Sequence, residues 1–465
     1  MRYVSTRGQA APIAFDAAML SALAPDGGLY MPEAWPQLAP DEVRALATRT
    51  YPEVALQVLK RFSGEAIPLA DLYTAIIAAY RRFDAPEVTP LTDLGGGIHL
   101  LELFHGPTFA FKDVALQLLG RLMDWGLKRS GRRALIVGAT SGDTGTAAIE
   151  GLRGLASVDV VILHPKGRTS PVQRRQMTTV LDANVRNLAI EGNFDDCQAI
   201  VKTLFGDADL VARHGLAAVN SINWARIAAQ IVYYVVAAAK LGAPDRPVDF
   251  SVPTGNFGDI FAGYAAHRMG VFDGRLVIAT NENDILARTL ASGRYEPRGV
   301  VPTATPSMDI QVSSNFERLL FEAAGRDGAL VARLMDDLKA KGAFELPPAL
   351  LAFIRARFDA ERVTGAEAAA EMAATERAHG MILDPHTAVG VVAARRRRRA
   401  GVPMVALATA HPAKFPDAVT AAIGHAAPVP AVLAAMETMP ERCDTLPAET
   451  GAVKAYIEAF IGGKT

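Results

Sequence analysis

Lys112 lies in the run HGPTFAFKDVA, residues 105–115, with Phe109 and Phe111 before it and Asp113 after it. An apolar, aromatic setting disfavours the charged ammonium, so a lysine there loses its proton more easily. The neutral amine is a nucleophile, and its best-known use is a Schiff base with a carbonyl compound. Because most lysines lie on solvated surfaces, this run alone leaves an ordinary surface lysine as the alternative.

A first glycine turn follows in VGATSGDTGTAAIEG, residues 137–151. The apolar residues before the turn predict a strand, and the alanine-rich residues after Thr144 predict a helix. The turn itself carries Ser141, Gly142 and Asp143. A helix N-terminus that follows a glycine turn points free N–H groups and the positive end of its dipole at one place, where an anion can bind. An ordinary helix cap by Ser or Asp is the alternative.

A second glycine turn lies in DFSVPTGNFGDIFAGY, residues 249–264. Gly255 and Gly258 allow a phosphate to approach the backbone closely, and Asn256 tolerates a left-handed conformation. The spacing matches neither the nucleoside-triphosphate loop nor the dinucleotide fingerprint. The turn is therefore a candidate cradle for a monophosphate, with a plain turn between strand and helix as the alternative.

A third candidate is the strand end in VALATAHPAKF, residues 405–415, which carries Thr409 and His411. In open α/β sheets, ligands collect at the carboxyl ends of the strands. A hydroxyl at that place can hydrogen-bond a cofactor ring. The alternative is a turn that begins at Thr409 and Pro412.

Alternating strand and helix patterns must position these four segments. Helices are predicted over 40–62 and 69–83, and a glycine run at 95–97 marks a break. Strands are predicted at 135–139, 158–163, 185–190, 248–252, 275–280 and 403–408. Such alternation predicts parallel sheets covered by helices, which is an α/β fold. The residues 292–310, rich in Pro, Gly and Thr, are expected to form an ordered loop over a site.

Composition narrows the class of protein. Of the 465 residues, 50 % are hydrophobic and 21 % charged, and the formal net charge is −1, which is typical of a globular protein with a large core and gives no basic field for nucleic acid. The arginine run 395–399 is the local exception, and we expect it to end a helix rather than bind a partner. Two cysteines favour a reducing, cytoplasmic location, and no spacing predicts a metal site or a membrane span.

Similarity to a known family runs over almost the whole length. The blocks are YVSTRG, APDGGLYMP, FHGPTFAFKD, TSGDTG, HPKGRTSPVQRRQM, NSINWARI, PTGNFGD, TPSMDIQVSSNFER, DPHTAVG and TAHPAKF. In these blocks the chain resembles the threonine synthases of the longer form found in fungi and many bacteria, within the fold type II pyridoxal-phosphate enzymes. The resemblance implies two parallel-sheet α/β domains with the cofactor in the cleft between them, preceded by a mainly helical N-terminal domain. We expect these domains at 1–95, 96–245 and 246–465, with true boundaries that are discontinuous in sequence.

The resemblance also implies roles for particular residues. Lys112 would hold pyridoxal phosphate, and Thr409 would face its pyridine nitrogen. The cofactor phosphate would bind at the turn Gly255, Asn256, Phe257, Gly258 and Asp259. Asp259 is an unexpected neighbour for a phosphate, because like charges repel, so its backbone N–H is expected to be the useful group.

The first glycine turn would receive the substrate carboxylate through Thr140, Ser141, Gly142, Asp143 and Thr144. Many relatives in the fold carry Asn where this chain has Asp143. Since two carboxylates repel, we expect Asp143 to turn away, to cap the helix or to contact another group.

The expected substrate is O-phospho-L-homoserine, whose phosphate needs a second group of anion-binding side chains. The candidates in the family-like blocks are Lys166, Arg168, Ser170, Asn223, Arg226 and Ser307. The reaction would be a γ-elimination of phosphate followed by a β-addition of water, which gives L-threonine. Two other functions stay open, a threonine or serine dehydratase of the same fold and a non-catalytic homologue that binds a metabolite. The expected protein binds neither nucleic acid nor membrane and is a monomer or a homodimer.

Overall fold

The computed structural model describes residues 1–21 and 23–463. Its residues divide into two compact units. The first comprises residues 1–19, 23–115 and 221–427, and the second comprises residues 20–21, 116–220 and the described part of 428–465. Helix α5 (Lys112–Arg129) begins in the first unit and continues in the second. The three-part division that the sequence predicts, at 1–95, 96–245 and 246–465, stays a prediction.

The first unit is built on a sheet of six strands among the described residues. In spatial order these are β14 (Phe358–Arg362), β11 (Leu276–Thr280), β10 (Asp249–Pro253), β15 (Met404–Ala408), β5 (Ile98–Glu102) and β4 (Leu91–Asp93). Every neighbouring pair is parallel except β4 and β5. The parallel strands are buried on both faces, which is why β10, β11 and β15 appear in the sequence as continuous apolar runs.

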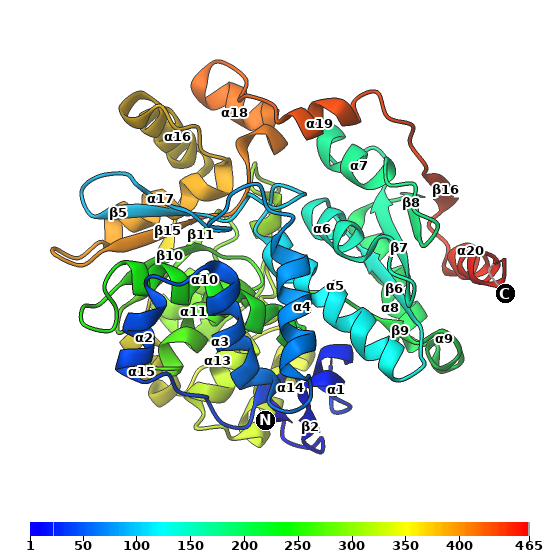
Figure 1. Ribbon diagram of the computed structural model, residues 1–465, viewed down its shortest axis with the longest axis horizontal. Coiled ribbons are helices and arrows are strands. Elements are labelled where there is room, and N and C mark those ends of the chain that lie inside the picture. The colour runs from blue at the N-terminus through cyan, green and yellow to red at the C-terminus, as the bar shows by residue number, and fades with distance from the viewer. Residues whose placement is uncertain (22, 464–465) are drawn as a thin grey trace. The chain divides into compact units, whose positions relative to one another are not determined.

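Helices cover both faces of this sheet (Figure 1). One face packs on α16 (Gly365–His379), α17 (Pro385–Arg397) and α18 (Pro416–Ile423), whose apolar residues share a core with Val277, Met404 and Ala406. The other face lies under α10 (Trp224–Lys240) and α11 (Gly258–Arg268). Helix α10 is buried along almost its entire length, because it also packs on α2 (Pro40–Leu46) and α3 (Tyr51–Ser63).

The remaining elements of this unit are short or peripheral. A three-stranded antiparallel sheet is formed near the N-terminus by β2 (Ile13–Ala14), β1 (Arg2–Ser5) and β3 (Tyr30–Pro32). The strands β12 (Arg294–Tyr295) and β13 (Phe344–Glu345) form a two-stranded ribbon. The other helices are α1 (Phe15–Leu20), α4 (Leu69–Tyr80), α12 (Ile285–Ser292), α13 (Phe316–Ala323), α14 (Gly328–Lys341), α15 (Pro348–Arg357) and the 3₁₀ turns η1 (Pro306–Met308) and η2 (Pro412–Lys414).

The second unit is a parallel sheet of five strands among the described residues. The spatial order is β16 (Asp444–Pro447), β8 (Val185–Glu191), β7 (Val158–Pro165), β6 (Ala134–Ala139) and β9 (Leu216–Ala217). Helices α8 (Phe194–Gly206), α9 (Ala208–His214) and α20 (Thr450–Gly462) cover one face, and α6 (Asp143–Leu152) and α7 (Pro171–Thr178) lie on the other (Figure 1). Helix α19 (Ala431–Met436) contacts α7.

Most predicted elements are confirmed, and the α/β class with parallel sheets and helices on both faces is correct. The six predicted strands correspond to β6, β7, β8, β10, β11 and β15. The single helix predicted over 40–62 is wrong, because the chain breaks after α2. Thr50 and Glu53 form a capping box there, and Pro52 at the first turn starts α3 anew. Of the residues 292–310, the structure leaves most without regular structure.

Candidate active site

Lys112 begins helix α5 and is buried, with 7 % of its surface exposed. Its Nζ atom donates to the hydroxyl of Ser307 at 3.3 Å and lies 4.8 Å from the centre of the Phe111 ring. Ser307 belongs to η1, so the loop 292–310 reaches the lysine. The aromatic setting that the sequence predicts for Lys112 is therefore present.

Backbone hydrogen bonds join the lysine loop to the end of β15. The N–H of Phe111 donates to the carbonyl of Thr409 at 2.8 Å, and the N–H of His411 donates to the carbonyl of Phe109 at 3.0 Å. Within the loop, the carboxylate of Asp113 accepts from the N–H of Thr108 at 2.7 Å and from its hydroxyl at 2.9 Å. These bonds fix Lys112 and Thr409 beside each other although they are far apart in sequence.

The turn after β10 is shaped for close approach. A Cβ atom added at Gly255 would lie 2.6 Å from the carbonyl oxygen of Ser307, so only glycine fits there. Phe257 has a φ of 63°, a left-handed conformation that a bulky residue adopts at a cost. Its ring is held in edge contact with Phe316, with a centre-to-centre distance of 5.4 Å. Packing of the aromatic ring thus fixes a strained backbone at the start of α11.

Residues 313–315 hold the carbonyl groups of this turn. The hydroxyl of Ser313 donates to the carbonyl of Gly255 at 2.6 Å. The carbonyl of Asn256 accepts from the N–H of Asn315 at 3.0 Å and from its Nδ2 at 2.9 Å. With these carbonyls engaged, the N–H groups at the start of α11 remain for an anion, because the first N–H groups of a helix have no partner within the helix.

Arg318 supports this arrangement from behind. It is fully buried, and its guanidinium donates to the carbonyls of Tyr30 and Ile222 and to the side chain of Asn315. Burial lowers the pKa of Arg318 to about 9. Ser313, Asn315 and Arg318 lie in the family-like block TPSMDIQVSSNFER, and the resemblance of that block is the only sequence signal for their role.

The side chain of Asp259 points into the protein, toward helix α10. Its Oδ1 atom accepts hydrogen bonds from the hydroxyls of Tyr233 at 2.5 Å and Tyr234 at 2.8 Å. Burial raises the pKa of Asp259 to about 6, against the lowering effect of the two hydroxyls and of Lys112. Two tyrosines on α10 therefore hold the carboxyl, a partnership between distant segments that no local sequence pattern predicts.

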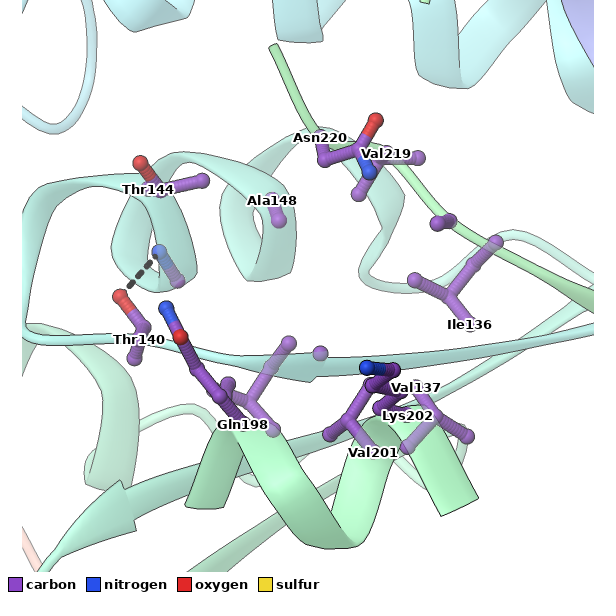
Figure 2. Close-up of a pocket in the computed structure, with 15 residues that line it drawn as sticks. Ile136, Val137, Thr140, Thr144, Ala148, Gln198, Val201, Lys202, Val219 and Asn220 are labelled. Atoms are coloured by element: carbon purple, nitrogen blue, oxygen red, sulfur yellow. Dashed lines mark hydrogen bonds between the residues drawn. The ribbon is translucent and has the colours of Figure 1, made fainter. Parts of the chain in front are cut away.

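In the second unit, the loop after β6 is held by its own residues. The hydroxyl oxygen of Thr140 accepts from the N–H groups of Gly142 at 3.0 Å and Gly145 at 2.9 Å, and the second of these bonds is drawn in Figure 2. Asp143 opens α6, and its Oδ1 accepts from the Nε2 of Gln173 at 2.9 Å. Thr140 thus organises the loop, and Asp143 has another side chain as its partner.

A cavity of about 240 Å³ lies behind this loop in the second unit. Figure 2 shows its walls, which come from β6 and the loop after it, from β7, α6 and α8, and from residues 218–220. The walls are mainly aliphatic, and the polar side chains that line it are Thr140, Thr144, Gln198, Lys202 and Asn220. Two residues of the predicted carboxylate loop, Thr140 and Thr144, therefore border a cavity.

The predicted phosphate-binding side chains have different surroundings. In the second unit, exposed Lys166 pairs with Glu191 at 2.9 Å, Arg168 is exposed, and Ser170 caps α7. In the first unit, Asn223 caps α10, and its Nδ2 donates to the carbonyl of Met19 at 2.7 Å. Arg226 is buried on α10, and burial lowers its pKa to about 10.

Contacts within each unit thus join two sets of predicted residues. In the first unit they connect Lys112, Ser307, Thr409 and the turn 255–259. In the second unit they connect Asp143 to Ser170 through Gln173, whose backbone and side chain both bond Ser170. The contacts of Lys166 and Asn223 instead run to Glu191 and to the carbonyl of Met19.

The first set fits pyridoxal phosphate. Lys112 offers an amine for the carbonyl, the turn before α11 offers N–H groups for the phosphate, and Gly255 leaves room that a Cβ would fill.

Among residues 1–21 and 23–463, no cluster of side chains could hold a metal ion. Within the same residues, no helix has the length and apolar content that crossing a membrane requires.

Family models, related sequences and solved structures match this chain over nearly its whole length. Family models match residues 2–80 (threonine synthase N terminus), 83–337 (pyridoxal-phosphate dependent enzyme) and 387–457 (threonine synthase, C-terminal). A threonine synthase of Pseudomonas aeruginosa is 52 % identical over 459 residues, which cover 98 % of both chains. A crystal structure of pyridoxal-phosphate-bound threonine synthase from Brucella melitensis superposes with a TM-score of 0.97 at 54 % identity, covering 99 % of each chain. The yeast threonine synthase structure gives a TM-score of 0.94 at 41 % identity, with the same coverage.

Proposed function

The chain belongs to the threonine synthase family of pyridoxal-phosphate enzymes, and we propose that it converts O-phospho-L-homoserine and water to L-threonine and phosphate with Lys112 as its catalytic lysine. The observation that carries the role of Lys112 is its place: a buried amine, 3.3 Å from the hydroxyl of Ser307, beside the glycine turn that opens α11. Pyridoxal phosphate, when bound, supplies an electron sink for the charge that develops on the substrate.

Lys112 moves protons in this proposal. With the substrate held at the cofactor, the freed Nζ would act as the base that removes the proton from Cα and then one from Cβ. The bond from Cγ to the phosphate oxygen would break and Cγ would gain a proton. A water oxygen would then add to Cβ as the water gives up a proton, and Cα would regain a proton to give L-threonine. The Ser307 hydroxyl lies within reach of Nζ and keeps the amine in place while it is free.

The two glycine turns receive the anionic groups. The turn 255–259 would hold the cofactor phosphate through its N–H groups, and Thr409 would face the ring nitrogen with a neutral hydroxyl. Ser141 and Thr144 would take the substrate carboxylate, and the Gln173 amide keeps the Asp143 carboxylate occupied with a hydrogen-bond donor. The loop 166–170 would meet the substrate phosphate through Lys166, Arg168 and Ser170, and Asn223 and Arg226 remain further candidates.

A paired assay tests the proposal. Wild type and Lys112→Ala are supplied with pyridoxal phosphate and O-phospho-L-homoserine, and phosphate and L-threonine are followed together. We expect equal amounts of both products from wild type and a loss of at least about a thousandfold in the variant. Phosphate without threonine would indicate a dehydratase-like outcome, and loaded wild type without product would indicate a non-catalytic homologue.

The proposal includes the setting of the enzyme. Its partner is a small-molecule substrate, without nucleic acid or membrane, and the protein acts as a monomer or homodimer. Cys197 and Cys443 are both free thiols, which supports a reducing, cytoplasmic location. Size-exclusion chromatography with light scattering would distinguish a monomer from a dimer.

A further inference from the structure

Asp259 presents a charge problem at the turn that opens α11. A carboxylate in the first turn of a helix complements the helix dipole, and so does a phosphate at the same N-terminus. Both cannot be fully charged in a buried place without repulsion. Asp259 has only 8 % of its surface exposed, so water does not screen that repulsion well.

The hydrogen bonds around Asp259 differ between its two oxygens. The hydroxyls of Tyr233 and Tyr234 both donate to Oδ1. The Nε2 of Gln230 donates to the Tyr233 hydroxyl at 3.2 Å, which directs the proton of that hydroxyl toward Asp259. Among the described residues, Oδ2 is buried and has no hydrogen-bond partner. A buried charged oxygen without a donor costs more than a buried neutral hydroxyl, and because both tyrosines donate to Oδ1, a proton added to the carboxyl would go to Oδ2.

The charged and titratable groups around Asp259 come from several elements. Helix α10 contributes Tyr233 and Tyr234, with Arg226 beyond Tyr233. Tyr51 of α3 also interacts with Tyr233, and Lys112 of α5 interacts with Asp259 by charge. On the side of α13, Glu322 pairs with Arg268 at the other end of α11. Lys112 is thus the cation that favours the ionised carboxyl before a phosphate arrives, and burial raises the pKa of Asp259 to about 6.

We propose that Asp259 takes up a proton on Oδ2 when a phosphate dianion binds at the turn Gly255–Gly258, so that cofactor binding is coupled to proton uptake. In the cofactor-free protein the carboxylate supplies the negative charge at the start of α11. When the phosphate supplies that charge instead, the carboxyl becomes neutral. Asp259 then acts as a positioning residue that adjusts the site to the charge of the phosphate. This inference rests on the proposed role of the turn as the phosphate site.

The test measures protons rather than activity. Pyridoxal phosphate is titrated into cofactor-free protein by calorimetry at about pH 7.5, in two buffers of different ionisation enthalpy, for wild type and Asp259→Asn. Because the cofactor's own protons cancel in the difference, wild type should take up close to one more proton per cofactor than the variant. Above neutral pH, the affinity of wild type should fall relative to the variant by up to about tenfold per pH unit.

Two further variants keep the proposal open to refutation if Asp259→Asn folds poorly. Tyr233→Phe and Tyr234→Phe each remove a donor that favours the carboxylate, so each should move the proton-uptake window to higher pH. Asp327→Asn, which changes an exposed cap of α14, is the matched control and should leave the proton count unchanged. Equal proton counts in wild type and Asp259→Asn, or an unmoved window in both tyrosine variants, would overturn the coupling.

Two other measurements separate this inference from the proposed phosphate site. Pyridoxal, which lacks the phosphate, should bind wild type and Asp259→Asn with the same proton count. In Gly255→Ala the new Cβ would push the turn away from the carbonyl of Ser307 and so displace the N–H groups that would hold the phosphate, so the variant should bind pyridoxal phosphate much more weakly while pyridoxal changes less. If Gly255→Ala weakens both equally, the phosphate-site assignment fails. If it discriminates but Asp259→Asn does not change the proton count, only the coupling fails.

Discussion

The two glycine turns look alike in sequence but are held in different ways. Each follows a buried parallel strand and opens a helix, β10 before α11 and β6 before α6. The turn before α11 is held from outside by residues 313–315, which bond its carbonyls. The loop before α6 is held from inside, by the hydroxyl of Thr140. A strand–glycine–helix pattern therefore indicates where an anion can bind, but not how rigid that place is.

The acidic residues that follow each turn show the same contrast. Asp259 is held by two tyrosines of α10, which lie 25 and 26 residues earlier in the chain. Asp143 is held by Gln173, on a neighbouring helix of the same unit. Asp259 is thus a buried carboxyl with two phenol donors, whose pKa burial raises, whereas Asp143 accepts a hydrogen bond from an amide. Variants that treat the two turns in parallel can therefore separate their roles.

Glycine replacement should give the largest difference between the turns. In Gly255→Ala the obstacle is the backbone carbonyl of Ser307, and in Gly142→Ala it is the end of the Gln173 side chain. A backbone atom cannot move aside, so Gly255→Ala should weaken cofactor binding by about 2–3 kcal/mol, close to a hundredfold. A side chain can rotate away, but the φ of 158° at Gly142 is one that an alanine rarely adopts. Gly142→Ala should therefore raise KM for the substrate by about tenfold while cofactor affinity changes little. Equilibrium titration of the cofactor and steady-state kinetics measure the two effects.

An equal loss of cofactor affinity in both variants would contradict the distinction between an externally held and an internally held turn. Gly131→Ala is not a suitable control, because Gly131 has a φ of 64°. Gly451→Ala is suitable, since a Cβ there meets no atom within 4 Å and the residue lies in the first turn of α20.

The pH dependence of stability should be the next largest effect. The pKa of Asp259 is about 6 in the folded protein, above its ordinary value, so its favourable contribution is complete below pH 3.8 and is lost as the pH rises through about 6. We compare the free energy of unfolding of cofactor-free Asp259→Asn with that of cofactor-free wild type at each pH. This difference should favour the variant more at about pH 8 than at low pH, by at most about 3 kcal/mol. Denaturant unfolding at several pH values measures this difference.

Asp207 of the second unit should show the opposite sign. Its hydrogen bond to Lys454 lowers the pKa of Asp207, so its contribution is present at neutral pH and is lost as the pH falls through the lowered value. Asp207→Asn should then lower stability at neutral pH and lose this effect in acid. The same sign in both variants would contradict the roles given to the two carboxyls.

Elements of the fold that form from continuous segments can be predicted from the sequence. The strands β6 and β10, the glycine turns and the lysine run are continuous segments, so periodicity and composition predict them. Strands β5 and β14 were not predicted. β14 has mixed burial, and its pairing with β11 joins residues more than 80 positions apart. The capping signal of α3, Thr50 and Glu53, lies within an otherwise periodic stretch, which is why periodicity alone predicts one continuous helix there.

The supports of the site could not be derived from local patterns. Ser313 bonds a carbonyl 58 residues earlier in the chain, and Arg318 bonds the carbonyl of Tyr30, 288 residues earlier. The partners of Asp259 lie on another helix, so its raised pKa depends on tertiary packing. Conversely, the arginine run 395–399 was expected to end a helix, and Arg395, Arg396 and Arg397 in fact end α17 in ion pairs with Glu361, Glu367 and Glu371.

Single hydrogen bonds should give the smallest effects and the sharpest test of the comparison. Ser313→Ala removes the donor to the carbonyl of Gly255, so cofactor binding should weaken by about 1 kcal/mol, roughly fivefold, with little change in KM. The next residue supplies a matched control: the Ser314 hydroxyl lies 3.5 Å from the Asn256 side chain, too long for a strong bond, so Ser314→Ala should cost less.

Gln173→Ala is the counterpart in the second unit. It removes the donor to Asp143, which leaves a carboxylate uncompensated beside the loop that would receive the substrate carboxylate. KM should therefore rise severalfold while the affinity for the cofactor stays unchanged. If Ser313→Ala changed KM and Gln173→Ala changed cofactor affinity, the assignment of the two turns to the two anions would have to be exchanged. The expected result, in which Ser313→Ala changes only cofactor affinity and Gln173→Ala changes only KM, supports one turn for the cofactor and the other for the substrate. Each supporting side chain then acts only on the anion beside it.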